Sequence, residues 1–408
     1  MNGQLGLGDD ANRSLPVKVV EANVTVVAAG GRHTLFLDAN GSLWAAGANE
    51  AGQLGDQTTA DRNSSVSVVP ADVAAVAAGA GHSYFLKTDG SLWAMGLNVD
   101  GQLGLGNVVN VSSPVQVVSD GPYRLPGQQA VVGQGSFFSL IRDVNGSLRG
   151  MGQNDNGELG LTGSADRTSS MILSSSAKTF SVGGDYSLFV KSDGSLSGMG
   201  SNAYGQLGDG TMIDRNESVQ VWPSGVAAVS ASGSDRFSLF LESNGSLMGM
   251  GRNLNGELGL GDTDQRLTPV SLATSVVSFA SGHDHALYVK RDGSLWAMGS
   301  NIYGQLGDGT MADRNASVQV DANVSAVAAG DGHSFFLKRD GSLWSMGRND
   351  FGQLGDGTFI HKTTPTQEST GATNWFAVAA GIGHTVALKS VGTQPTPTPI
   401  PSTSGWGL

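Results

Sequence analysis

Short apolar runs separated by Gly- and Asn-rich breaks recur along almost the whole chain. Between Gly330 and Thr358, an apolar run from His333 to Leu337 is followed by the dipeptide Asp340-Gly341 and by a second apolar run from Leu343 to Met346. Asp-Gly between two short apolar runs predicts a β-hairpin, because both central residues of a type I′ turn need positive φ. No segment shows a sustained helical period of apolar positions, so the pattern predicts an all-β fold.

The hairpin belongs to a tandem repeat with two fixed landmarks. The first is a tetrad of Gly, Gln or Glu, Leu and Gly, which begins at Gly3, Gly52, Gly101, Gly157, Gly205, Gly256, Gly304 and Gly352. The second is the turn Gly before Ser-Leu, at Gly41, Gly90, Gly146, Gly194, Gly245, Gly293 and Gly341. Both series advance by 48 to 51 residues, apart from one step of 56 that contains the turn-rich insertion Gly121–Gly127.

Each repeat predicts four short strands. In the seventh repeat these are residues 317–320, 324–329, 333–338 and 342–346. Four antiparallel strands in a unit of this length are typical of a β-propeller blade. The second strand is rich in Ala and ends in Gly, and small residues are expected where blades converge on the central channel. We therefore predict that this strand lies nearest the axis.

The chain ends complicate the blade count. There are eight tetrads and eight copies of the third strand, but seven copies of the fourth. The chain begins just after a missing fourth strand and stops, at Lys389, just before another. Seven blades leave surplus strands at the ends, whereas eight leave one blade incomplete. We predict a propeller over residues 1–392. Residues 393–408, with alternating Pro and Thr, predict an extended linker or tail, which implies a further domain or an anchor beyond it.

Two stretches carry a family signature: GHSYFLKTDGSLWAMGLNVDGQLG from Gly81 and GHSFFLKRDGSLWSMGRNDFGQLG from Gly332. They resemble the repeat of the regulator of chromosome condensation family, and the resemblance covers nearly all of residues 1–392. It implies a seven-bladed β-propeller of four-stranded antiparallel blades, closed by strands from the two chain ends. Eight blades, one of them incomplete, are the alternative.

The same resemblance implies several functions, because a shared fold does not select among them. The founding member of the family is a guanine-nucleotide exchange factor for a small GTPase that also docks on chromatin. Other members associate with ubiquitin ligases or are secreted bacterial inhibitors. This chain lacks a basic N-terminal arm and a long wedge-like insertion, so no catalytic residue is transferred from the exchange factor.

Charge and composition narrow the classes of partner and cofactor that are expected. The 408 residues carry a net charge of −12 and contain no Cys. An acidic chain without basic clusters disfavours nucleic acids and anionic membranes as partners. No apolar run approaches the ~20 residues that span a bilayer. The absence of Cys excludes disulfides and thiolate metal sites, and no cofactor is predicted.

Residues that look catalytic recur at one repeat position each. The third strand begins with His33, His82, His285, His333 and His384, and two other repeats have Tyr186 and Phe237 there. We interpret this position as one that packs a flat ring, because catalysis needs one constellation in one place. The pair His283 and His285 would need a third ligand to bind a metal. Trp44, Trp93, Trp296 and Trp344 of the fourth strand are interpreted as core.

The loops after the fourth strand predict structural roles as well. The tetrad lacks the Lys of a phosphate-binding loop. Its Gly residues permit a tight loop, its Leu packs between blades, and its Gln or Glu binds loop backbone. Each loop offers too few carboxylates for calcium, and solvated turns or Asp–Arg pairs are expected instead. The carboxylates concerned are Asp61, Asp209, Asp214, Asp308, Asp313 and Asp356.

The most informative variation lies just before the tetrad. Tyr204, Tyr303 and Phe351 stand there in three repeats, and Arg252 and Arg348 precede the fixed Asn in two. Variable side chains on a rigid repeated loop form a ring on one propeller face, and aromatic residues with Arg are enriched at binding hot spots. Drift at exposed loop tips is the alternative. We predict that these five residues bind an unidentified protein partner.

The sequence therefore favours a non-enzymatic propeller for protein–protein interaction or scaffolding. We expect it to be a module of a bacterial surface or secreted protein, located outside the cell or at its surface. The alternatives are a guanine-nucleotide exchange factor for a small GTPase and a glycan-binding propeller.

Overall fold

The computed structural model describes residues 2–20, 24–117, 132–134, 137–232, 236–381 and 383–390. The insertion at 121–127 and the Pro- and Thr-rich segment 393–408 lie outside these residues, so their predictions stand as made. Within the described residues, no helix has the length and hydropathy needed to cross a membrane.

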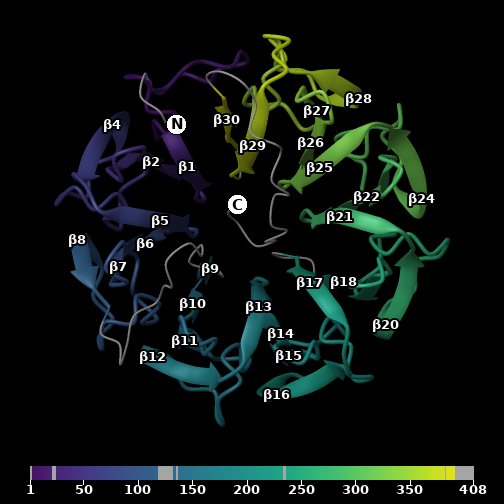
Figure 1. Ribbon diagram of the computed structural model, residues 1–408, viewed down its shortest axis with the longest axis horizontal. Coiled ribbons are helices and arrows are strands. Elements are labelled where there is room, and N and C mark those ends of the chain that lie inside the picture. The colour runs from purple at the N-terminus through teal and green to yellow at the C-terminus, as the bar shows by residue number, and fades with distance from the viewer. Residues whose placement is uncertain are drawn as a thin grey trace.

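The described strands form seven four-stranded antiparallel sheets and one two-stranded sheet (Figure 1). In chain order they are β1 (Val24–Ala29), β2 (His33–Asp38), β3 (Leu43–Gly47), β4 (Arg62–Val69); β5 (Val73–Ala78), β6 (His82–Lys87), β7 (Leu92–Gly96), β8 (Val111–Gln116); β9 (Val132–Gln134), β10 (Phe138–Arg142), β11 (Leu148–Gly152), β12 (Arg167–Ser174); β13 (Ala177–Val182), β14 (Tyr186–Lys191), β15 (Leu196–Gly200), β16 (Arg215–Trp222); β17 (Val226–Ala231), β18 (Phe237–Glu242), β19 (Leu247–Gly251), β20 (Arg266–Ala273); β21 (Val276–Ser281), β22 (His285–Lys290), β23 (Leu295–Gly299), β24 (Arg314–Asp321); β25 (Val324–Ala329), β26 (His333–Lys338), β27 (Leu343–Gly347), β28 (Lys362–Gln367); and β29 (Trp375–Ala380) with β30 (Thr385–Lys389).

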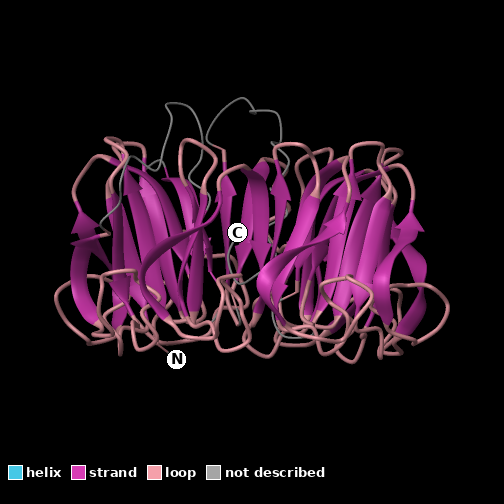
Figure 2. Cartoon of the chain, turned by 90° about the horizontal axis from the view of Figure 1, so that it is seen from below, coloured by secondary structure: helices cyan, strands magenta, loops and turns pink. Residues whose placement is uncertain are grey.

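The sheets stand around a common centre as the blades of a propeller, with the strands upright between two rims of loops (Figure 2). Seven four-stranded blades are confirmed. The surplus strands β29 and β30 form an eighth, two-stranded sheet that contacts β25 and β26 of the seventh blade and β1 of the first. This arrangement matches the alternative of eight blades with one incomplete.

Three of the four strands predicted for the seventh repeat are confirmed to within one residue as β25, β26 and β27. The predicted strand at 317–320 falls in β24, which pairs with β23 and is the outermost strand of the preceding blade. Each blade therefore begins at the Ala-rich strand, and this strand lies nearest the axis as predicted (Figure 1).

The predicted hairpin at Asp340-Gly341 is confirmed, but the prediction of a type I′ turn is wrong. Only Gly341 of the two residues has positive φ, at 80°. Gly341 N–H donates to Lys338 O (2.9 Å) and Lys338 N–H donates to Ser342 O (3.0 Å). This is a three-residue loop in which Gly follows the turn in the left-handed conformation. Asp340 stabilises it by accepting a hydrogen bond from Ser342 N–H (2.9 Å).

The apolar cores lie between neighbouring blades. Leu54, in the tetrad that begins at Gly52, is fully buried and packs with Leu35 of its own blade and with Phe85 and Met95 of the next. The same arrangement recurs at the other seams, for example with Leu306 between the sixth and seventh blades. The predicted packing of the tetrad Leu between blades is therefore confirmed.

Candidate protein-binding face

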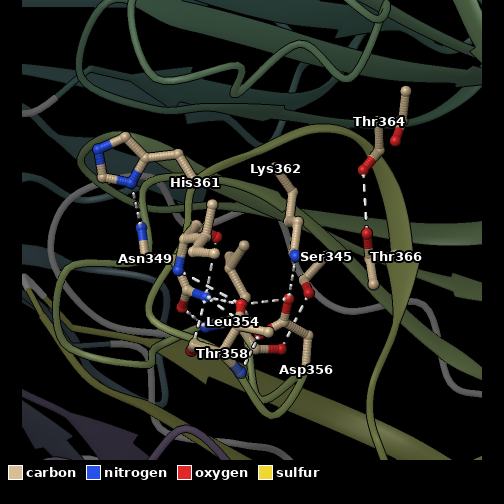
Figure 3. Close-up of polar contacts among 10 residues, drawn as sticks. Ser345, Asn349, Leu354, Asp356, Thr358, His361, Lys362, Thr364 and Thr366 are labelled. Atoms are coloured by element: carbon tan, nitrogen blue, oxygen red, sulfur yellow. Dashed lines mark hydrogen bonds and ion pairs between the residues drawn. The ribbon is translucent and has the colours of Figure 1, made fainter.

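One rim of the ring carries the long loops between the third and fourth strands of each blade, together with the short turns between the first and second strands. We call this rim the long-loop face. A buried Asn holds each long loop (Figure 3). Asn349 Nδ2 donates to Thr358 O (3.0 Å) and Ile360 O (3.2 Å), and its Oδ1 accepts from Leu354 N–H (3.0 Å). The equivalent residues, all fully buried, are Asn49, Asn98, Asn154, Asn202, Asn253 and Asn301.

Loop carboxylates complete this framework. Asp308 accepts hydrogen bonds from Asn301 Nδ2 (3.0 Å) and Thr310 Oγ1 (2.8 Å) and pairs with Arg314. Burial raises the pKa of Asp308, but the hydrogen bonds from Thr310 and Arg314 outweigh it and hold the pKa below the ordinary value. Asp209 pairs with Arg215 in the same way. The predicted Asp–Arg pairs are confirmed for Asp209 and Asp308, and Lys362 takes the place of Arg beside Asp356 (3.0 Å). The other three carboxylates accept hydrogen bonds from the backbone N–H of the buried Asn residues: Asp61 from Asn49 (2.8 Å), Asp214 from Asn202 (2.7 Å) and Asp313 from Asn301 (2.7 Å).

The Gln or Glu of the tetrad binds the backbone of its own loop, as predicted. Gln305 Oε1 accepts from Tyr303 N–H (2.9 Å), and Gln353 Oε1 accepts from Phe351 N–H (3.0 Å). The residue before each tetrad is thereby fixed at its backbone, which leaves its side chain to vary.

The loops of the sixth and seventh blades bring three predicted site residues together. The Arg348 guanidinium lies 5.3 Å from the centre of the Tyr303 ring and 5.6 Å from that of Phe351. It also forms ion pairs with Asp350 (2.7 Å) and Asp331 (3.3 Å). The hydrogen bond from Arg348 to Asp350 raises the pKa of the guanidinium, although partial burial opposes this. All three site residues are half-buried.

The two other predicted residues lie at neighbouring seams. The Arg236 guanidinium lies 5.6 Å from the centre of the Tyr204 ring and pairs with Asp185 (3.0 Å). Arg252 pairs with Glu257 (3.1 Å) and Asp284 (3.0 Å). Tyr204 and Arg252 thus contact residues at two different seams of the ring.

Sequence reasoning missed one aromatic residue, His361, and the exposed apolar residues on the long-loop face. The His361 ring meets the Tyr303 ring edge-on at 5.3 Å and accepts a hydrogen bond from Asn349 N–H (3.0 Å). Four other repeats have Asp at the His361 position and two have Asn110 or Gln265, so the aromatic substitution is visible in the sequence. Apolar loop tips on the same face are exposed, including Ile302 (57%) and Ile360 (69%). Ile302 directly precedes the variable Tyr303.

The repeated His residues are structural, as interpreted. His285 is fully buried, and its Nε2 lies 2.8 Å from Ser334 Oγ of the next blade. Ser334 Oγ donates to Gln305 O (2.8 Å), so His285 Nε2–H is the donor of the first bond. Burial lowers the pKa of these side chains to about 3 in His33 and His333 and to about 4 in His82, His285 and His384. Tyr186 and Phe237 are fully buried at the same position.

The pair His283 and His285 does not converge on a common site. His283 Nδ1 pairs with Asp284 (3.1 Å), whereas His285 points across the blade seam to Ser334. The two side chains are thus engaged with different partners.

The Trp residues, interpreted as core, lie at its edge: Trp93, Trp296 and Trp344 pack against the apolar clusters between blades. They are half-buried, and each lies against the aromatic ring opposite it on the second strand of its blade. Trp296 stacks on Tyr288 at 6.3 Å, its Nε1–H donates to Ser294 Oγ (3.0 Å), and Lys290 Nζ lies 4.6 Å from its ring centre. Within the blade, Trp296 is paired with Tyr288 and His285 with Gly299, so the Trp and His positions are not cross-strand neighbours.

Comparison with known proteins supports the fold. A family model described as "Regulator of chromosome condensation (RCC1) repeat" matches residues 1–37, 40–86, 89–137, 244–289, 292–337 and 340–388. A second model with the same description matches residues 24–53, 73–102, 276–305 and 324–353. No match was found among curated proteins.

Solved structures with the same fold include human WBSCR16, with 21% identity and a TM-score of 0.66 over 86% of this chain and 99% of that one. Prp20p from Saccharomyces cerevisiae, described with its binding properties to Gsp1p and histones, has 20% identity and a TM-score of 0.61 over 81% and 87% of the two chains. Yeast RCC1 (Prp20) bound to Kap60 has 20% identity and a TM-score of 0.61 over 91% and 81%. At these identities the likeness shows the fold alone. With repeats matched over most of its length, the chain belongs to the regulator of chromosome condensation repeat family.

Proposed function

We propose that this chain is a non-enzymatic, protein-binding propeller, and that its long-loop face binds the partner through a site centred on Arg348. The observation that carries the proposal is the placement of the Arg348 guanidinium over the rings of both Tyr303 and Phe351. Arg and aromatic side chains supply most of the binding energy at protein interfaces.

The rigidity of the loops supports this proposal. The backbones of Tyr303 and Phe351 are bound by Gln305 and Gln353, and the loop of Arg348 is held by buried Asn349. A side chain that is already ordered loses less conformational entropy on binding, which favours affinity.

The character of the surface gives a second argument. The half-buried Arg348 and its carboxylates lie in loops whose tips expose apolar side chains, Ile302 and Phe359 (49% exposed) among them. A charged, hydrogen-bonding centre beside exposed apolar side chains is the composition of a protein interface. We propose Tyr204 and Arg252 as secondary contacts at the adjacent seams.

Capture of proteins by the immobilised chain tests the proposal. The variant Y303A/R348A/F351A should lose a partner that the unchanged chain retains. The control is R291A/R339A, which changes two exposed side chains on hairpin turns at the opposite rim. If both variants retain the partner equally well and keep the thermal stability of the unchanged chain, the long-loop face is not the binding site.

We also propose that the propeller is a module of a bacterial surface or secreted protein, based on the Pro- and Thr-rich segment 393–408 and the Cys-free repeats. Fractionation of the cells that encode it should find the protein in the surface or medium fraction. A purely cytoplasmic location would overturn this part of the proposal.

A further inference from the structure

The seven long loops are built alike and lie wholly within the described residues. Each has 14 residues and runs from the end of a third strand to the start of a fourth: 48–61, 97–110, 153–166, 201–214, 252–265, 300–313 and 348–361. Together they contain 16 acidic residues and two basic ones, Arg252 and Arg348. The loops alone thus have a formal net charge of −14, against −12 for the whole chain.

Basic residues beside the loops do not neutralise this charge, because most of them are paired with the carboxylates that hold the loops. Six of the seven fourth strands begin with a half-buried Arg or Lys. Five of these side chains pair with a carboxylate of their own loop: Arg62–Asp56, Arg215–Asp209, Arg266–Asp262, Arg314–Asp308 and Lys362–Asp356. The group around Arg348 holds one guanidinium and two carboxylates, Asp331 and Asp350, so it is itself negative.

The exposed side chains of the long loops are therefore acidic or apolar wherever they are charged or large. Eight carboxylates of the seven loops are exposed, whereas both of their Arg residues are half-buried. The exposed carboxylates are Glu50, Asp61, Asp155, Asp166, Asp214, Asp264, Asp313 and Asp350. Ten large apolar side chains are exposed in the same loops: Val99, Val108, Val109, Met212, Ile213, Leu254, Ile302, Met311, Phe359 and Ile360.

The opposite rim has neither feature. Its seven hairpin turns, taken with the residue that ends each second strand, contain seven acidic and seven basic residues. All seven turns are described, and none of the exposed large apolar side chains lies in them. The excess of negative charge and of exposed apolar surface is thus specific to the long-loop face.

We propose that the partner of the long-loop face binds through a cationic segment that also presents apolar side chains. This inference rests on the proposed function, which places the partner on this face. Lys or Arg residues of the segment would meet the exposed carboxylates, and its apolar residues would cover the exposed loop tips. Complementary charge speeds association and disfavours acidic competitors, whereas apolar side chains form the buried core of an interface.

The repeats themselves offer a substitution that removes charge and keeps the local hydrogen bond. Four of the exposed carboxylates accept, through Oδ1, a bond of 2.7 to 3.0 Å from the backbone N–H of the buried Asn in their own loop: Asp61, Asp166, Asp214 and Asp313. In the second blade, Asn110 Oδ1 accepts the same bond from Asn98 N–H (2.8 Å). The variant D61N/D166N/D214N/D313N should therefore fold like the unchanged chain, with four fewer charges on the long-loop face.

A matched control removes the same number of charges from the opposite rim. Four exposed carboxylates of the hairpin turns accept a bond from the Ser N–H two residues later: Asp89, Asp193, Asp292 and Asp340. Asn244 makes the same contact with Ser246 N–H (2.8 Å). The control D89N/D193N/D292N/D340N therefore changes the net charge equally and differs only in the face that loses it.

The probe is a fluorescently labelled amphipathic peptide of Lys and Leu, LKKLLKLLKKLLKL, whose binding to the full chain is measured by anisotropy. We expect saturable binding that weakens as NaCl is raised from about 50 to about 500 mM. Affinity should fall at least about tenfold when every Lys of the peptide is replaced with Glu, or every Leu with Ser. It should fall to a similar extent in D61N/D166N/D214N/D313N, whereas D89N/D193N/D292N/D340N should bind like the unchanged chain.

No binding of the Lys and Leu peptide, equal binding of its Glu counterpart, or an equal loss in the two protein variants would overturn the proposal. So would a captured partner that Y303A/R348A/F351A loses and D61N/D166N/D214N/D313N retains in full, because the proposed function would then stand without a cationic segment. Retention of the partner by Y303A/R348A/F351A would instead remove the proposed function, and this inference with it, whatever the peptides show.

Discussion

Replacing His285 with Tyr should reduce the loss of stability that acid causes in this protein. His285 is fully buried, and burial holds its pKa at about 4, with a smaller opposing effect from Asp284. Tyr should fit because Tyr186 occupies the same position in the fourth blade, where its hydroxyl donates to Phe237 O (2.7 Å). Gly282, like Gly183 beside Tyr186, has no side chain where the ring lies.

The direction of the effect follows from the lowered pKa. Above pH 6.5 the imidazole is neutral in both the folded and the unfolded chain, and its full contribution to stability is present. Below that pH the unfolded chain takes up a proton that the folded chain does not, and stability falls until the pH reaches the folded pKa of about 4. At ~1.4 kcal/mol per pH unit, this costs about 2 kcal/mol per His at pH 5. Across the five buried His residues the loss is on the order of 10 kcal/mol.

The assay is urea unfolding of the unchanged chain and of H285Y between pH 8 and pH 5. The difference in unfolding free energy between the two proteins should shift in favour of H285Y by about 2 kcal/mol over this range. Carboxylates common to both proteins cancel in the difference. A difference that does not change with pH would show that His285 is not buried in the neutral form, and would refute the reasoning.

Three further predictions concern the loop framework, the strand positions and the function. N301A should lower the unfolding free energy by about 2–4 kcal/mol in urea unfolding. It leaves the buried Leu306 N–H without its partner, at ~1–3 kcal/mol, and removes the bonds to the part-buried carbonyl groups of Thr310 and Ala312, which water reaches in part and which cost less. A change below about 0.5 kcal/mol would contradict it. L295A should lower the unfolding free energy by about 2–5 kcal/mol, and W296L should lower it clearly less, because Leu295 is fully buried and Trp296 half-buried. Equal losses in thermal unfolding would restore the interpretation of Trp as core. The chain should not accelerate GDP release from a panel of small GTPases, and acceleration would contradict the non-enzymatic proposal.

The fold was largely predictable because each repeat encodes its own blade. Ala-rich strands, Gly turns and the tetrad Leu act locally, so β25 to β27 were located from one repeat. The type I′ turn was wrong because Asp-Gly also suits a longer loop in which only Gly341 has positive φ. The burial of Trp296 was overestimated because apolarity does not reveal that its half-buried ring stacks on Tyr288 and lies close to the Lys290 ammonium group.

The site was predictable in part. The variable loop positions identified Tyr303, Arg348 and Phe351 as candidates, but the contact of Arg348 with Tyr303 crosses the seam between two blades. Asp331 joins them from a turn on another part of the repeat, and a single repeat gives no sign of this. Likewise, counting strands in the sequence revealed an incomplete blade. The hydrogen bond from Gly357 N–H to Ser14 O, which joins the two ends of the chain, depends on closure of the whole ring.

Footprinting of a captured complex by hydroxyl radicals tests the central claim most directly, because it reports which face of the propeller the partner covers. The account predicts protection of Ile302, Tyr303, Phe351 and Phe359, with side chains at the opposite rim as reactive as in the free chain. Protection confined to the opposite rim, with the long-loop face fully reactive, would contradict it.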